Sequence, residues 1–144
     1  VLVGTGARLR VLPAIFDELK NNYPAYVDNS LTRGAAYLTP EDIERRRAWL
    51  GRIDPMVIHG DFEACDAFDI MDRVGEIRLP TLIIVGRDDV MTPVKYAEFL
   101  SQKIPGSRLV IIERAGHAVP MERGDEVNRA IDEFVKTLDP AAAR

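Results

Sequence analysis

Residues 80–86 read Pro-Thr-Leu-Ile-Ile-Val-Gly, and this stretch decides the fold class. It is a continuous β-branched and apolar run with no polar alternation, closed by Gly86. Such a run is typical of a strand buried on both faces of a parallel sheet, with helices covering each face. The stretch therefore predicts an α/β fold.

The segments around this strand are expected to complete a parallel sheet. Thr92-Pro93 opens a helix that stops before Pro105, a second buried strand follows at residues 109–112, and residues 1–3 form a third, short strand. A final amphipathic helix is expected from an apolar stripe at Val127, Ile131, Phe134, Val135 and Leu138. Strands and helices that alternate through short connections give parallel strands with right-handed crossovers. In such sheets, functional sites lie at the carboxyl ends of the strands.

Residues 12–76 are expected to be mostly helical. Helices are predicted to begin at Pro13, Pro40 and Pro55, because proline suits the first helical turn. Asp69 is expected to cap a last short helix through residue 74. Residues 29–37 show no helical pattern.

The composition indicates one ordinary soluble domain. The 144 residues include 19 Lys and Arg against 23 Asp and Glu, for a formal net charge of -4. This balance argues against nucleic acid as a partner, and no apolar run is long enough to cross a bilayer. One cysteine (Cys65) and two histidines cannot form an internal disulfide or a structural zinc site. A cytoplasmic location is expected.

Two polar residues follow the two buried strands directly. Asp89 lies in the turn after the first strand, and His117 follows the second, 28 positions further along the chain. Because the carboxyl ends of neighbouring parallel strands meet at one edge, the carboxylate can accept a hydrogen bond from the imidazole and fix its tautomer. The pair is therefore the candidate acid and base of a catalytic triad. The alternative is a turn aspartate and a surface histidine without function.

Three linked motifs in this half of the chain resemble a known family. Residues 79–93 (Leu-Pro-Thr-Leu-Ile-Ile-Val-Gly-Arg-Asp-Asp-Val-Met-Thr-Pro), residues 104–109 and the Ala-Gly-His at 115–117 closely resemble the C-terminal third of α/β-hydrolase-fold enzymes. The resemblance implies that Asp89 is the triad acid and His117 the base. Asp88 is the alternative acid, but the family's carboxylate usually occupies the fourth position of this turn.

The resemblance also divides the chain. Residues 1–11 match a core strand and loop, 12–76 the position of an inserted helical cap, 77–138 the C-terminal core, and 139–144 a disordered tail. A cap supplies the apolar wall of a substrate pocket. Candidate pocket residues are Trp49, Met56, Phe62, Phe68 and Met71, although each could instead simply hold the cap together. His59 and Cys65 are expected to be structural.

The nucleophile of this family is missing from the sequence. It sits on a G-x-S-x-G elbow that precedes the acid and the base, and none of Ser30, Ser101 and Ser107 has the flanking glycines. The chain also begins at Val1, without Met and inside a strand, so we expect a fragment whose N-terminal half carries the nucleophile, Ser or Asp. The fragment alone should be inactive. Gly4-Thr5-Gly6 is not a dinucleotide motif, because Leu9 stands where the third glycine would be.

The resemblance implies that the complete enzyme hydrolyses an ester-like bond in a small, largely apolar substrate, without a cofactor or metal. Other chemistries of the fold remain open: lactonase, carbon–carbon bond hydrolase, haloperoxidase, dehalogenase and epoxide hydrolase. One rival hypothesis is a non-catalytic hydrolase-like binding domain. Another is an intact small domain, whose bare sheet edge would pair with a second copy to form a homo-oligomer.

Overall fold

The protein is built on a sheet of three parallel strands. The computed structural model describes residues 1–34 and 36–138, so the tail expected at 139–144 lies outside the described residues. The strands β1 (Leu2–Val3), β2 (Leu82–Gly86) and β3 (Arg108–Ile112) lie in the order β1-β2-β3. All pairs are parallel, with Ile83 opposite both Leu2 and Leu109. The α/β fold predicted from residues 80–86 is confirmed.

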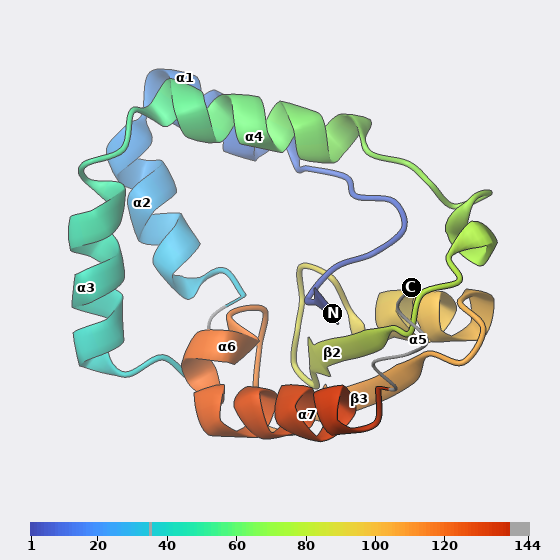
Figure 1. Ribbon diagram of the computed structural model, residues 1–144. Coiled ribbons are helices and arrows are strands. Elements are labelled where there is room, and N and C mark those ends of the chain that lie inside the picture. Colours follow the sequence, from blue (N-terminus) through green and yellow to red (C-terminus); the bar gives the residue numbers. More distant parts are fainter. Residues whose placement is uncertain (35, 139–144) are drawn as a thin grey trace.

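Strand β2 is buried along its whole length, and its side chains alternate between two cores. Leu82 and Ile84 pack with helix α7 (Gly124–Lys136), whereas Ile83 and Val85 pack with helix α5 (Val94–Lys103). The two helices therefore cover opposite faces of the sheet (Figure 1). This double coverage explains why the strand has no polar alternation.

Four helices between β1 and β2 form a separate unit, which we call the helical unit. They are α1 (Pro13–Asn21), α2 (Tyr23–Thr32), α3 (Pro40–Leu50) and α4 (Pro55–Ala67). The helical unit has its own apolar core, built around Leu19, Leu31 and Leu50. It extends away from the sheet on the side of α6 (Val119–Glu122) and the end of β2 (Figure 1). Its position in the chain is that of the expected cap.

The structure corrects three sequence expectations in detail. Helix α2 was not predicted; it begins after Asn22, whose side chain accepts a hydrogen bond from the N–H of Ala25. Asp69 caps no helix but closes a turn by accepting from the N–H of Met71, and only a short 3₁₀ helix, η1 (Val74–Glu76), follows. In α7 the buried residues are Val127, Ala130 and Phe134, and Ile131 packs against the same core; Val135 is exposed, and so is Leu138, which follows the helix.

No helix in the described part of the chain is long and apolar enough to span a membrane.

Candidate active site

The site is formed where the turn after β2 meets the loop after β3. The N–H of Asp88 donates to the carbonyl oxygen of Ala115 at 2.9 Å. A Cβ atom on Gly86 would lie 2.3 Å from the carbonyl oxygens of both Ala115 and Gly116. Only glycine permits this approach of the two backbones. The strand ends thus bring the residues that follow them, Asp89 and His117, into contact.

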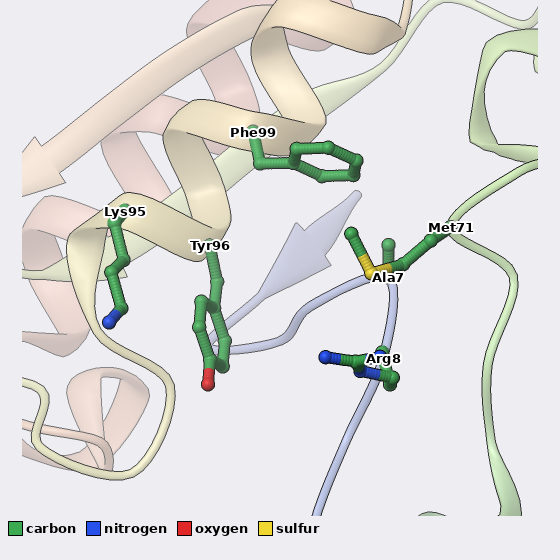
Figure 2. A pocket seen from close by; sticks show the side chains of 6 residues that line it. All are labelled: Ala7, Arg8, Met71, Lys95, Tyr96 and Phe99. Carbon is green, nitrogen blue, oxygen red and sulfur yellow. The ribbon is translucent and has the colours of Figure 1, made fainter.

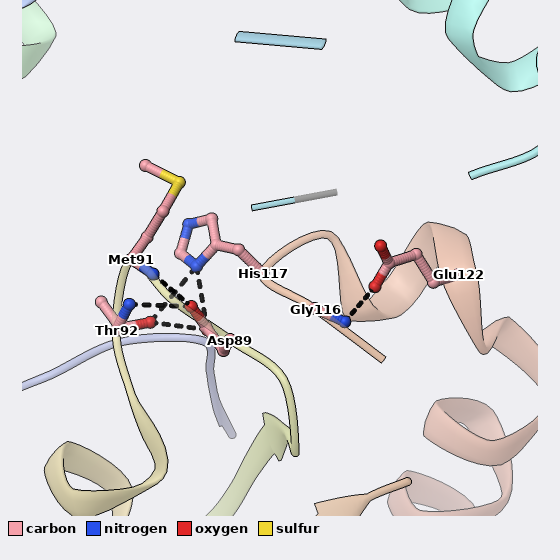
Figure 3. Close-up of polar contacts among 6 residues, drawn as sticks. All are labelled: Asp89, Met91, Thr92, Gly116, His117 and Glu122. Carbon is pink, nitrogen blue, oxygen red and sulfur yellow. Dashed lines mark hydrogen bonds and ion pairs between the residues drawn. The ribbon is translucent and has the colours of Figure 1, made fainter. Parts of the chain in front are cut away.

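The side chain of Asp89 is buried and fully engaged in hydrogen bonds (Figure 3). Its Oδ1 accepts from the N–H groups of Met91 at 2.9 Å and Thr92 at 2.8 Å. Its Oδ2 accepts from the Thr92 hydroxyl at 2.8 Å and from Nδ1 of His117 at 3.0 Å. Burial alone would raise the pKa of Asp89, but the hydrogen bonds from His117 and Thr92 together hold the pKa below its usual value. Asp89 is therefore an anion at neutral pH.

His117 is half-exposed and oriented by Asp89. Because the ionised carboxylate can only accept hydrogen bonds, Nδ1 of His117 carries a proton and donates a hydrogen bond to Asp89. Nε2 then has a free lone pair in the neutral ring, and it points away from Asp89 (Figure 3). This is the arrangement in which an imidazole can take a proton from a third group.

The structure distinguishes between the two candidate aspartates. Asp88 is exposed, and its Oδ2 accepts from the phenol of Tyr37 at 2.7 Å. This hydrogen bond raises the pKa of Tyr37. It is Asp89 that lies against the imidazole, in agreement with the position preferred from the sequence.

A cavity of about 270 Å³ opens beside His117, between the loop after β1, helix α4 and the turn after β2. Its lining includes Phe62, Cys65, Met91 and Tyr96. A second cavity of about 350 Å³ shares Arg10, Val11, Phe62 and Met91 with it. Together they form a mostly apolar space that leads from the imidazole under the helical unit.

The five candidate pocket residues are placed differently. Phe62 lines both of these cavities. Met71 lines another cavity of about 250 Å³, between the loop after β1 and α5 (Figure 2). Tyr96 lines both this cavity and the one beside His117. Phe68 holds the loop after β1 through its carbonyl oxygen, which accepts from the N–H of Leu9. Trp49 and Met56 are exposed and line neither cavity near His117.

Several contacts of the site were not anticipated from the sequence. Thr92 bonds to Asp89 through both its N–H and its hydroxyl; its spacing of three residues from an aspartate was the available signal. Gly34, in the α2–α3 connection, accepts from the N–H of His117. Glu122 is buried and accepts from the N–H of Gly116. Nothing in its local sequence separates it from a surface glutamate.

Among the described residues, no three His, Cys, Asp or Glu side chains are grouped so that they could hold a metal ion.

A buried aspartate hydrogen-bonded to a histidine thus lies at the ends of two parallel strands, and this pair is the candidate acid and base of the site. Residues 2–124 match the family model described as alpha/beta hydrolase fold. The chain therefore belongs to the alpha/beta hydrolase fold family.

Relatives and solved structures agree with this assignment. A thermophilic esterase structure superposes with a TM-score of 0.82 at 42% identity, covering 93% of this chain and 54% of that one. The enol-lactonase from Burkholderia xenovorans LB400 superposes with a TM-score of 0.78 at 25% identity, again covering 93% and 54%. A pimeloyl-(acyl-carrier protein) methyl ester esterase of Neisseria meningitidis is 29% identical over 91 residues, which are 62% of this chain and 29% of the relative. The chain thus spans about half the length of the solved structures it resembles.

Proposed function

We propose that this chain supplies the acid and base of a nucleophile–His–Asp triad that hydrolyses an ester-like bond in a small, largely apolar substrate. His117 takes the proton of the nucleophile as that atom attacks the carbonyl carbon, and later returns a proton to the leaving group. Asp89 holds the imidazole in the required tautomer and stabilises the imidazolium that forms. The observation that carries the proposal is the 3.0 Å contact between Nδ1 of His117 and Oδ2 of Asp89 beside a cavity.

The nucleophile is proposed to come from residues outside this chain. The sequence has no G-x-S-x-G elbow, and Ser30, which is buried, donates its hydroxyl to the carbonyl of Val27. The chain spans only about half of its relatives, and this leaves room for a segment that carries the elbow. By the same reasoning, the chain alone does not turn over the substrate.

The lining of the cavities supports the proposed substrate class. Phe62, Met91 and Val11 offer apolar surface to an acyl or alcohol group. The relatives named above act on a methyl ester and on an enol-lactone, as their names state. Both are carbonyl compounds with an oxygen leaving group, and this supports an ester-like bond for the proposed reaction.

The test is kinetic and uses the complete enzyme, that is, this chain joined to a segment with a G-x-S-x-G or G-x-D-x-G elbow. His117→Ala and Asp89→Asn should each lower kcat for a short-chain nitrophenyl ester by roughly 10³-fold or more, with little change in KM. Asp88→Asn is the matched control, because it removes the neighbouring carboxylate that does not touch the imidazole. Unchanged turnover in both His117→Ala and Asp89→Asn would refute the triad. Turnover of the same ester by the 144-residue chain alone would refute the external nucleophile.

A further inference from the structure

Among the residues that the structure describes, Glu122 is the one buried acid besides Asp89, and the proposed reaction does not use it. It ends helix α6, five residues after His117, and only 8% of it is exposed. Among the described residues it forms no ion pair with a cation. A carboxyl group is costly to bury without such a partner unless its oxygens accept hydrogen bonds.

Both oxygens of Glu122 accept hydrogen bonds from the backbone. Oε2 accepts from the N–H of Gly116, the residue that precedes His117. Oε1 accepts from the N–H of Tyr37, at 3.1 Å and 85 positions away in the sequence. One side chain therefore joins the loop that carries the imidazole to the connection between α2 and α3 (Figure 3 shows the first of these bonds).

The two segments that Glu122 joins also touch each other at His117. The N–H of His117 donates to the carbonyl oxygen of Gly34 at 2.5 Å. That oxygen lies so close to Gly116 that a Cβ atom there would come within 2.6 Å of it. The backbone at Gly116 and His117 thus lies directly against the α2–α3 connection, and Glu122 bonds to both segments.

We propose that Glu122 is a positioning residue for His117. Its carboxyl group keeps the loop at 115–117 and the α2–α3 connection in one arrangement, in which Nδ1 of His117 meets Asp89. The proposal rests on the function proposed above, in which His117 is the base. Misplacing a reacting group by about 1 Å can lower the rate roughly a hundredfold. A backbone that holds His117 in a fixed position therefore keeps kcat high.

The first experiment uses the 144-residue chain and does not depend on catalysis. Glu122→Gln keeps the shape of the side chain but turns an NH₂ group toward one of the two N–H donors. In an NMR experiment, the backbone amides of Gly116 and Tyr37 should exchange with solvent about tenfold faster or more. The Nδ1–H resonance of His117 should broaden or disappear. Glu122→Asp keeps both acceptors but withdraws them by one methylene, so its effect should be intermediate.

The matched control is Glu126→Gln. Glu126 lies in α7 and pairs at the surface with Arg123, at 3.8 Å, so this variant removes the same charge without touching the loop. Both amide exchange and the Nδ1–H resonance should stay as in the wild type. Wild-type behaviour of Glu122→Asp and Glu122→Gln in these two readouts would overturn the proposal; if Glu122→Gln does not fold, Glu122→Asp alone decides.

The second experiment separates this proposal from the proposed function. In the complete enzyme, Glu122→Gln should lower kcat about ten- to a hundredfold and change KM less than about twofold, because orientation and not binding is lost. An unchanged kcat in Glu122→Gln together with an inactive His117→Ala would overturn only the positioning role. Full activity of His117→Ala would overturn the triad itself.

Discussion

The N–H of His117 donates to the carbonyl oxygen of Gly34, 2.5 Å away, so the candidate base is held by a residue of the helical unit. The helical unit and the sheet meet at this point, and Tyr37 adds a second contact through its hydroxyl to Asp88. The helical unit therefore both lines a cavity and bonds to the loops at the ends of β2 and β3. Its α2–α3 connection contacts both the loop that carries His117 and the turn that carries Asp89, and the following predictions test these contacts.

Gly34 has a φ of +80°, and a Cβ atom there would lie 2.8 Å from Sδ of Met91 and 3.0 Å from Cβ of His117. Gly34→Ala should therefore destabilise the chain by about 1–2 kcal/mol or more, measured by urea unfolding. Gly60→Ala is the control. Gly60 lies in α4 with no atom near its missing Cβ, so the change should stabilise by about 0.5–1 kcal/mol. Equal effects of the two variants would contradict the role of Gly34.

The pKa of Asp89 is held below its usual value in the folded chain, mainly because hydrogen bonds from His117 and Thr92 outweigh the effect of burial. A lowered folded-state pKa stabilises the fold above the pKa of the unfolded chain, and this stabilisation is lost as pH falls through the folded value. Asp89→Asn should therefore cost about 1–3 kcal/mol at pH 7. The difference from wild type should shrink below about pH 4, where a free aspartate takes up its proton. Urea unfolding at several pH values measures it, and a constant difference from pH 7 to pH 3 would contradict the prediction.

Thr92 is buried and donates its hydroxyl to Oδ2 of Asp89. Thr92→Val keeps the shape of the side chain and removes this donor, so it should destabilise the fold by about 1 kcal/mol. Thr32→Val, at the exposed end of α2, is the control and should change the free energy of unfolding by less than about 0.5 kcal/mol. If Thr92→Val were neutral, the hydroxyl would have no part in holding the carboxylate.

The meeting of Asp89 and His117 could be predicted from the sequence, because the buried run at 80–86 requires a parallel sheet and parallel strands end at one edge. The contacts that Gly34 and Glu122 make around this pair could not be predicted from the sequence. Gly34 acts through its backbone carbonyl, and the carboxylate of Glu122 accepts from backbone N–H groups; such backbone groups carry no residue-type signature, and the bond between Glu122 and Tyr37 spans 85 positions. Phe62 and Trp49 are both apolar residues on helices. Only the position of α4 beside the loop after β1 puts Phe62 in the cavity, whereas α3 leaves Trp49 in solvent.

The phenol of Tyr37 donates to Asp88, and this hydrogen bond raises the pKa of Tyr37. Asp88→Asn removes the charge that disfavours the phenolate, so Tyr37 should ionise at a lower pH, closer to about 10. The measurement is an ultraviolet titration of Asp88→Asn against wild type, with Tyr37→Phe in both backgrounds to assign the signal. An unchanged titration of Tyr37 would mean that the connection is not docked on the Asp88 turn in solution.

Phe62 lines the cavity beside His117 and the second cavity that adjoins it, whereas Trp49 is 61% exposed on α3. In the complete enzyme, Phe62→Leu removes aromatic surface from the cavity but keeps it apolar, so KM for a nitrophenyl ester should rise several-fold while kcat changes less. The loss should grow with the length of the acyl chain, because each buried methylene contributes about 0.8 kcal/mol of binding. Trp49→Leu is the matched control and should leave both constants unchanged. A larger effect of Trp49→Leu than of Phe62→Leu would mean that the substrate enters along α3 and not under α4.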